Sequence, residues 1–390
     1  MPDAQAPRAV TGDAASPRLS VVVTARNDNH GGDMLQRMQI FVDGLLDQCR
    51  RHGLRAELII VEWNPPPDRP RLAGALSWAR EPGPCAVRII EVPPYVHRRY
   101  RYADRLPLFQ MIAKNVGIRR ARGKFVLSTN IDLLFSDALM RFLASGQLDP
   151  GCMYRIDRFD VSAAVPVAAL IDRQLEYCRR HVIRVNTRRG TFEKGRPILL
   201  PLLAKIPPWL AKAWGDPALV PEVFLAMILR LFDRGLHTNS CGDFTMLSEE
   251  RWRVLRGYPE AEMYSLHLDS VFCNMAVHAG AREVILRKGM RLYHIEHASG
   301  WSPAGSEPLR RRMRELGVPM LDMDGYRVWV NAIKKGPTPP VANGEDWGLG
   351  LEDLRETHPL QMAPEAAALG TPAAAAGGAP EAAGALVHDR

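Results

Sequence analysis

The chain has 390 residues, of which 46% are hydrophobic and 24% charged, a composition ordinary for a globular protein. Its net charge of +8 favours anionic partners such as phosphorylated substrates, lipid head groups or nucleic acid. No run of 18 apolar residues occurs, which argues against a membrane-spanning helix, and no apolar stretch near the N-terminus indicates a signal peptide. The six cysteines lack the C-x-x-C spacing of zinc sites and the pattern of a disulfide framework, which favours a reducing, cytoplasmic location.

Both ends of the sequence are poor in bulky apolar side chains. Residues 1–18 are rich in Ala, Pro and Asp, and residues 364–390 form an Ala/Gly/Pro segment of low complexity. Such segments cannot bury enough surface to fold. We therefore expect a disordered N-terminus over 1–18 and a disordered tail over 364–390.

Between these ends, short apolar runs alternate with helical patterns. The predicted elements are strands at 19–24, 57–61, 87–92, 124–128 and 283–286, helices at 34–52 and 106–120, and a helix that begins near 267–270. Continuous apolar runs are typical of strands that are covered on both faces. The alternation predicts an α/β fold of the Rossmann-like kind, with a mainly parallel central sheet flanked by helices.

Two further segments are less regular. Residues 136–237 are expected to form a helical insertion, in which the apolar, proline-broken stretch 206–232 can be plain core helices, an acceptor-binding insertion or a surface that rests on a membrane. Residues 301–363 are expected to be a C-terminal extension, helical or irregular.

A carboxylate marks the end of the strand predicted at 124–128. Asn130 and Asp132 follow this strand, and open α/β sheets bind ligands at the carboxyl ends of their strands. An Asp with an oxygen ligand two residues away can hold a divalent cation against a diphosphate. Asp132 can instead cap the helix that is expected to start near Ser136.

Several short motifs occur in a distinctive order. They are SVVVTARND at 20–28, LIIVEWN at 58–64, Lys114-Asn115-Val116-Gly117, Ala121-Arg122-Gly123, Asn130-Ile131-Asp132, Gly242-Asp243-Phe244, Gly257-Tyr258-Pro259-Glu260 and Leu268-Asp269. This order resembles the GT-A fold glycosyltransferases, and among them the large inverting family of bacterial polysaccharide and cell-surface sugar transferases. The resemblance covers roughly 19–135 and 238–297. Asn130 departs from it by replacing the first Asp of the metal motif, and Leu268 departs by replacing a Glu.

The resemblance implies a role for each matching position. It assigns donor contacts to Thr24, Ala25, Arg26, Glu62, Lys114, Asn115, Asn130 and Asp132, a divalent cation (Mn²⁺ or Mg²⁺) to Asp132, Asn130 and His294, acceptor contacts to Asp243 and His267, and the general base to Asp269. It also divides the chain into a nucleotide-sugar-binding half at 19–135 and an acceptor and catalytic half at 238–300.

Most of these positions have a plainer alternative. Arg26 and Lys114 can be surface charges, and Glu62 can be an exposed loop carboxylate. Asp269 suits the N-cap of the helix that it opens, and Asp243 can serve in a structural hydrogen bond.

Two histidines lie three residues apart in the motif YHIEH. On a strand, residues at this spacing face opposite sides, so His294 and His297 are not expected to share one metal. We expect His294 to be the ligand and His297 to be structural.

These observations predict a metal-dependent glycosyltransferase that moves a sugar from a nucleotide-diphosphate donor to a glycan or lipid-linked acceptor, with inversion expected and retention still open. A peripheral contact with the inner face of the membrane is compatible with the basic charge. Without a zinc-finger spacing or a basic repeat interleaved with aromatic residues, a nucleic-acid partner is not expected. The alternatives are a non-catalytic binding protein on the same scaffold, a sugar-phosphate nucleotidyltransferase, which would need a lysine in the ARNDNHGGD loop, and a nucleic-acid binder, which rests on charge alone.

Overall fold

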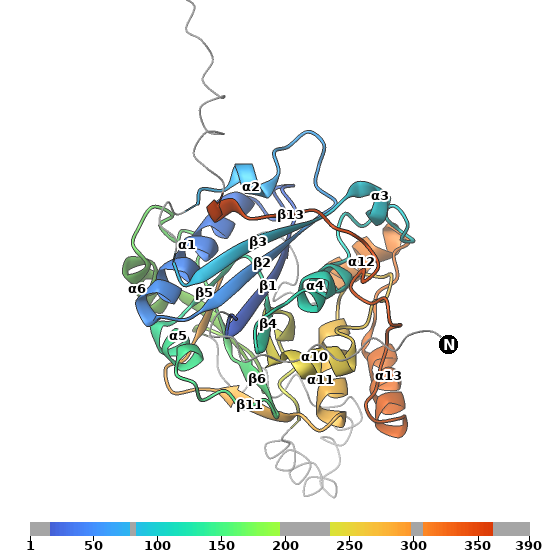
Figure 1. Cartoon of the computed structure of the whole chain (residues 1–390). Coiled ribbons are helices and arrows are strands. Elements are labelled where there is room, and N and C mark those ends of the chain that lie inside the picture. Colours follow the sequence, from blue (N-terminus) through green and yellow to red (C-terminus); the bar gives the residue numbers. More distant parts are fainter. Residues whose placement is uncertain (1–15, 79–82, 196–234, 298–306, 362–390) are drawn as a thin grey trace, which may run out of the picture. The chain divides into compact units, whose positions relative to one another are not determined.

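The computed structural model describes residues 16–78, 83–195, 235–297 and 307–361 (Figure 1). The strands are β1 (Leu19–Ala25), β2 (Ala56–Trp63), β3 (Cys85–Val92), β4 (Phe125–Thr129), β5 (Leu133–Phe135), β6 (Cys152–Ile156), β7 (Arg158–Val161), β8 (Val182–Thr187), β9 (Gly190–Glu193), β10 (Phe244–Ser248), β11 (Arg282–Leu286), β12 (Leu292–Ile295) and β13 (Glu356–Thr357). The helices are α1 (Met34–His52), α2 (Leu72–Ala75), α3 (Pro94–His97), α4 (Gln110–Arg119), α5 (Asp137–Ala144), α6 (Ile171–Arg180), α10 (Glu249–Leu255), α11 (Leu268–His278), α12 (Glu307–Glu315), α13 (Met323–Lys335) and the short 3₁₀ turns η2 (Cys241–Asp243) and η3 (Pro359–Gln361).

The strands form two mixed sheets, so the predicted α/β class is confirmed. The larger sheet has the order β11-β6-β10-β4-β1-β2-β3-β13, and its central strands β4, β1, β2 and β3 run parallel. β10 lies antiparallel between β4 and β6, and β13 is an antiparallel edge strand on β3. The smaller sheet has the order β5-β12-β7-β8-β9.

The central strands are covered on both faces, as their continuous apolar runs predict. Val21 and Val23 of β1 belong to the core that packs under α1, whereas Val22 belongs to the core under α4. Figure 1 shows α1 and α4 on opposite faces of the sheet. The approach of α4 is so close that a Cβ on Gly117 would lie 2.5 Å from Cγ1 of Val22. A glycine is therefore required where this helix crosses β1.

The prediction of a helical segment over 136–237 is wrong for its described residues. The segment contains β6 of the large sheet and β7, β8 and β9 of the small sheet, together with α5 and α6. The apolar stretch 206–232 lies outside the described residues, as do 1–15 and 362–390, which include most of the predicted disordered ends.

The other predicted boundaries shift by a few residues. The helix expected from 106 starts at Gln110, and Pro107 disfavours helical backbone in Leu106 before it. The extension at 301–363 contains α12 and α13, and it also adds β13 to the large sheet. No helix in the described part of the chain has the length and apolar character needed to cross a membrane.

Candidate metal and ligand site

A cavity of about 560 Å³ opens where β1 and β4 end. β1 and β4 are neighbours, while the chain connects β1 outward to β2 and β3 on the other side. The strand order therefore reverses between β1 and β4, and open α/β sheets bind ligands at such a switch point. The predicted donor-side residues Thr24, Ala25 and Arg26 line the cavity from β1, and Asn130 and Asp132 line it from the end of β4.

Asp132 lies in this cavity beside two histidines. Its Oδ2 is 3.0 Å from Nε2 of His297 and 3.7 Å from Nε2 of His294. The ligand atoms of the three side chains all lie within 4.8 Å of one another. Oδ1 of Asp132 is buried and has no hydrogen-bond partner in the described part of the chain. A buried carboxylate oxygen without a partner is costly, and a metal ion is one group that would satisfy it.

The electrostatics of the site keep Asp132 ionised. Burial raises the pKa of Asp132, but the nearby His294 and His297 and the Arg37 guanidinium outweigh it, and the net pKa lies below the ordinary value. An ionised carboxylate beside two imidazoles is a donor set that fits a divalent metal ion.

The prediction that His294 and His297 face opposite sides is wrong. β12 ends at Ile295, whose N–H donates to the carbonyl of Asp132, and Glu296 N–H then donates to Val161. His297 therefore lies beyond the strand, where the period of two no longer applies, and it reaches the same carboxylate as His294.

Asn130 is not positioned as the predicted metal ligand. Its Nδ2 donates to Oδ1 of Asp243 at 2.6 Å, and its Oδ1 accepts from Nε2 of Gln110 at 3.2 Å. The amide is thus committed to a link between β4 and the loop that precedes β10. The grouped metal-ligand atoms come instead from Asp132, His294 and His297, and a second group that shares His294 is formed with Asp160 and Glu296.

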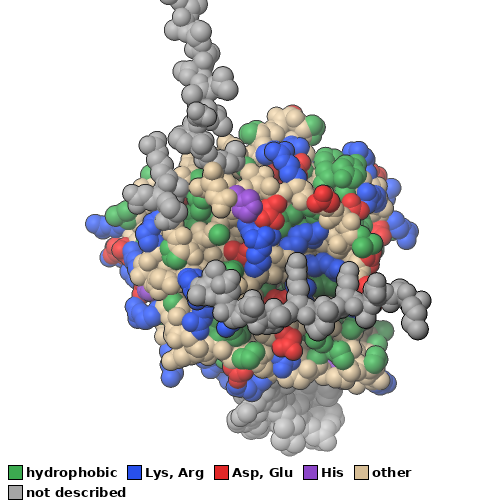
Figure 2. Space-filling model, viewed as in Figure 1, with side chains coloured by type: hydrophobic (Ala, Val, Ile, Leu, Met, Phe, Trp, Pro, Cys, Tyr) green, Lys and Arg blue, Asp and Glu red, His purple; other side chains and the backbone are tan. Residues whose placement is uncertain are grey.

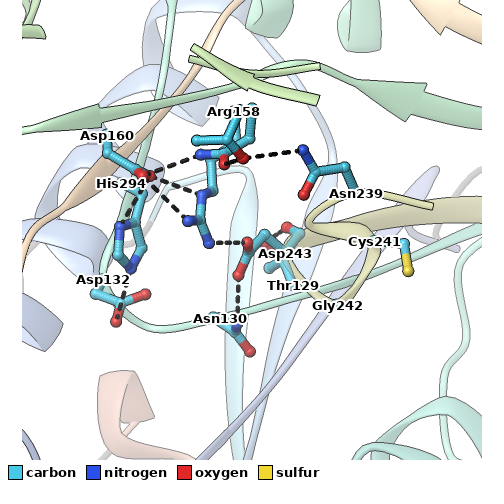
Figure 3. A network of polar contacts seen from close by, with 12 residues as sticks. Thr129, Asn130, Asp132, Arg158, Asp160, Asn239, Cys241, Gly242, Asp243 and His294 are labelled. Carbon is cyan, nitrogen blue, oxygen red and sulfur yellow. Dashed lines mark hydrogen bonds and ion pairs between the residues drawn. The ribbon is translucent and has the colours of Figure 1, made fainter. Parts of the chain in front are cut away.

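A buried ion-pair network supports the site from behind (Figure 3). Asp160 of β7 is fully buried, and its Oδ1 lies 3.2 Å from Nδ1 of His294 and 2.7 Å from Nε of Arg158. Its Oδ2 accepts from Asn186 at 2.9 Å and from Arg184. Burial raises the pKa of Asp160, but His294 and the guanidiniums of Arg158 and Arg184 lower it by more. The net pKa lies below the ordinary value.

Sequence reasoning missed this network, although a signal was present. Arg158 and Asp160 alternate along β7, as Arg184 and Asn186 do along β8, and residues two apart share one face of a strand. Charges that alternate within a strand beside the motif YHIEH indicate a polar buried face.

Arg158 also connects the metal-side residues to Asp243. Its Nη1 donates to Oδ2 of Asp243 at 2.6 Å, while Asn130 holds Oδ1. Both carboxylate oxygens of Asp243 are therefore engaged at the cavity wall, where acceptor contact was predicted.

Lys114 and Asn115 lie in the core below the cavity lining. Lys114 is fully buried and donates to the Gly242 carbonyl at 2.6 Å. Burial lowers its pKa to about 8, opposed by the nearby Asp243 and Asp269. Asn115 exchanges hydrogen bonds with the backbone of Tyr258 at 2.8 Å in each direction. Neither side chain lines the cavity formed by the described residues.

Asp269 and His267 also lie outside the lining that the described residues provide. Asp269 stands in the first turn of α11, and its Oδ1 accepts the N–H of Ser270 at 2.8 Å. A Cβ on Gly242 would lie 2.9 Å from Oδ2 of Asp269, so the carboxylate packs against the η2 turn. His267 precedes α11 in the left-handed region, with its ring 5.6 Å from that of Tyr326. The structure therefore brings Asp132 and Asp243 together in the cavity and leaves Asp269 behind the turn.

Glu62 is buried inside β2 and does not line the cavity of the described residues. Its Oε1 accepts the Leu72 N–H at 2.9 Å, at the start of α2. Burial raises its pKa from 4.5 to about 7, helped by Glu91 and opposed by the Leu72 N–H and by Arg71 and Arg355. The predicted contact with a base or ribose has no support in this position.

Glu62→Gln is expected to make the protein more stable at pH 8 by about 2–3 kcal/mol and to change little at pH 5. Because its pKa is higher in the folded state, Glu62 holds an extra proton there between pH 4.5 and 7. Its contribution to stability is therefore lost as pH rises through this window, and glutamine keeps the acceptor for Leu72 without the charge. Urea denaturation at both pH values measures the difference.

The exposed Glu250→Gln is the matched control and should leave the free energy of unfolding unchanged at both pH values. A Glu62→Gln variant that loses stability equally at pH 5 and pH 8 would show that the carboxylate is ionised throughout. A loss of nucleotide binding in that variant would support the prediction that Glu62 contacts the donor.

Arginines dominate the charge of the cavity. Six of them line it: Arg26, Arg37, Arg105, Arg158, Arg184 and Arg312. On the face of the molecule seen in Figure 2, by contrast, basic and acidic side chains are interspersed. A cavity rich in guanidiniums suits an anionic ligand, since arginine recognises phosphate and carboxylate through paired donors.

Comparison with known proteins adds no family assignment: no protein-family model matches the chain, and no curated protein does either.

Proposed function

We propose that the protein is a metal-dependent glycosyltransferase of the GT-A type that uses a nucleotide-diphosphate sugar as donor. The proposal rests on one observation above all: Asp132, whose Oδ1 has no hydrogen-bond partner among the described residues, meets His294 and His297 at the switch point of a parallel sheet, inside an arginine-lined cavity. The order of motifs that resembles this fold family supports the same assignment.

In this proposal each wall of the cavity has a separate task. Asp132 and the two histidines hold a divalent cation, which when bound neutralises charge that develops on the diphosphate leaving group. Arg26 at the end of β1 and Arg37 of α1 supply further positive charge to the same anion. Thr24 and Ala25 contribute the floor on which the nucleoside rests.

Part of the cavity lining suits a lipid-linked acceptor. It combines apolar side chains with two arginines: Leu106, Pro107, Leu108, Leu309, Met313 and Leu316, with Arg105 and Arg312. Apolar surface beside cationic groups fits a lipid chain that carries a phosphate. Gln110, Tyr264 and Ser265 line the same cavity and could donate or accept hydrogen bonds with the sugar that such an acceptor carries.

One observation favours the second candidate, a nucleotide-sugar-binding protein without turnover. Of the carboxylates expected near the acceptor, Asp243 has both oxygens engaged, and Asp269 packs behind η2. An inverting transfer needs a carboxylate that is free to accept the acceptor proton. The two candidates share donor binding and differ only in catalysis.

A thermal-shift panel tests the shared step. Nucleotide-diphosphate sugars with Mn²⁺ are expected to raise the melting temperature of the full chain, because a ligand that binds only the folded state stabilises it by mass action. Sugar phosphates and nucleoside monophosphates are the matched controls and should shift it less. If no nucleotide sugar shifts the melting temperature with or without metal, the donor proposal is wrong.

Turnover then separates the two candidates. Release of nucleoside diphosphate that increases when a short-chain polyprenyl phosphate is added is expected for the transferase. Donor binding without any release would assign the chain to the binding-protein class.

A further inference from the structure

We propose that Asp132, His294 and His297 form a nitrogen-rich site that selects a late first-row transition ion, such as Co²⁺ or Zn²⁺, over Mg²⁺. The inference deepens the proposed function and rests on its metal site. The donor set contributes one carboxylate and two imidazoles. Mg²⁺ prefers oxygen ligands in a strict octahedron, whereas imidazole nitrogen favours the later transition ions.

The distances between the ligand atoms suit one shared ion. Two ligands that each lie about 2.1 Å from a metal are separated from one another by roughly 3.0–3.4 Å. Oδ2 of Asp132 lies 3.0 Å from Nε2 of His297 and 3.7 Å from Nε2 of His294. The ligand atoms of the three side chains all lie within 4.8 Å of one another, so they must draw closer together to bind one ion.

Several neighbouring oxygens that could make the site more suitable for Mg²⁺ are already committed, including Oε2 of Glu296, which pairs with Arg184. The Asn130 carbonyl oxygen accepts from Gln110. Both oxygens of Asp243 pair with Asn130 or Arg158, and both oxygens of Asp160 face Arg158, Arg184 or Asn186. Among the described residues, Oδ1 of Asp132 and Oδ1 of Asp160 are both buried without a hydrogen-bond partner, but Oδ1 of Asp160 lies 2.7 Å from Nε of Arg158.

Asp160 prepares His294 for such an ion. Its Oδ1 lies 3.2 Å from Nδ1 of His294, and this negative charge favours a proton at Nδ1 rather than at Nε2. Nε2, the nitrogen that faces Asp132, then keeps its lone pair for the metal. Because Asn186 and Arg184 fix Asp160 in turn, the histidine ring has a defined orientation. A carboxylate behind a metal-binding histidine is a common outer-sphere arrangement. Asp160 is thus a positioning residue.

Metal titration of the full chain after chelator treatment, with no nucleotide present, tests the inference. Co²⁺ and Zn²⁺ are expected to bind on the order of 100-fold more tightly than Mg²⁺. Bound Co²⁺ should show a visible absorption spectrum that reports nitrogen ligands. Isothermal titration calorimetry and competition against a chromogenic chelator give the affinities.

Three variants locate the site. His297→Gln is expected to lower Co²⁺ affinity at least about tenfold and to alter the absorption spectrum. Asp160→Asn is expected to lower the affinity by about 10–100-fold while the spectrum still reports two nitrogen ligands. His30→Gln is the matched control, because its ring is 6.4 Å from that of His297 and outside the ligand group. It should bind Co²⁺ as the parent does.

The inference is overturned if Mg²⁺ binds as tightly as Co²⁺ to the parent chain, a comparison that needs no variant to fold. It is also overturned if His297→Gln, melting as the parent does, keeps full Co²⁺ affinity and spectrum. The proposed function fails separately: Co²⁺ binding without any shift by nucleotide sugars refutes the transferase and leaves the metal site standing. If Mg²⁺ supports donor binding as well as Co²⁺ does, the metal preference is refuted and donor binding by the protein stands.

Discussion

Asp132→Asn is expected to lower the affinity for Co²⁺ or Mn²⁺ by at least about 100-fold, beyond the effect of losing an outer-sphere partner. The substitution removes the negative charge at the centre of the site and replaces an anionic oxygen by a neutral amide. Donor binding that depends on metal should fall with it, because in the proposed function the cation links the carboxylate to the diphosphate. Calorimetry with the metal alone, followed by the nucleotide-sugar thermal shift, measures the two effects in order.

Asp28→Asn is the matched control for this experiment. Asp28 also lines the cavity but pairs with Arg26 at 2.9 Å, and it lies outside the grouped ligand atoms. Its substitution should leave metal affinity within about threefold of the parent. Because Oδ2 of Asp132 pairs with His294 and His297, metal-free Asp132→Asn is expected to melt below the parent temperature, and the metal titrations are therefore made well below both melting temperatures. An Asp132→Asn chain that binds metal normally would remove the basis of the proposed site.

The location of the site could be predicted from the sequence because it depends on strand ends. The apolar run that becomes β4 is followed by Asn130 and Asp132, and a parallel sheet gathers such residues at one edge. The same reasoning places Arg26 after β1. Arg26, Asn130 and Asp132 all line the cavity. Local pattern and the direction of the strands were sufficient here.

The membership of the site could not be predicted in the same way. His297 joins Asp132 because β12 ends two residues before it, and strand boundaries are the least certain feature of a sequence pattern. Asp160 reaches His294 only through pairing of β7 with β12, a contact between segments more than 130 residues apart. Pairing between distant strands is set by the tertiary fold, which no local motif encodes.

Glu62 and Lys114 show the opposite error, in which a plausible motif position turns out to be buried. Each matched a position that the resemblance assigns to the donor, yet both side chains are buried in the described structure and neither lines the cavity. A carboxylate near a strand end can point to the core as well as to the crevice, because successive side chains alternate between the faces of a sheet. The sequence carries no signal that chooses between these two faces when both are covered.

Arg88→Met is expected to lower the free energy of unfolding by about 3–5 kcal/mol, the cost of leaving a buried charge without its partner. Arg88 is 3% exposed, and its Nη1 donates to Oε2 of Glu57 at 2.8 Å. Its Nε and Nη2 hold both oxygens of Glu356 at 2.7 and 2.8 Å. Glu57 is 2% exposed, so methionine would leave its carboxylate in the core beneath β2. Urea denaturation measures the change.

Arg122→Met provides the contrast, because Arg122 also reaches Glu356, at 3.7 Å, but its own side chain is 60% exposed. An exposed pair of this kind contributes about 0–1 kcal/mol. The two arginine substitutions should therefore lower the free energy of unfolding by amounts that differ several-fold, although both arginines contact Glu356. Adding Glu57→Gln to Arg88→Met should recover part of the loss, since the second change removes the unpaired charge. A cost of less than about 1 kcal/mol for Arg88→Met would mean that water or a rearranged side chain neutralises Glu57. In that case β13 is held to β3 by its backbone pairing at Ile89 and Ile90 rather than by charge.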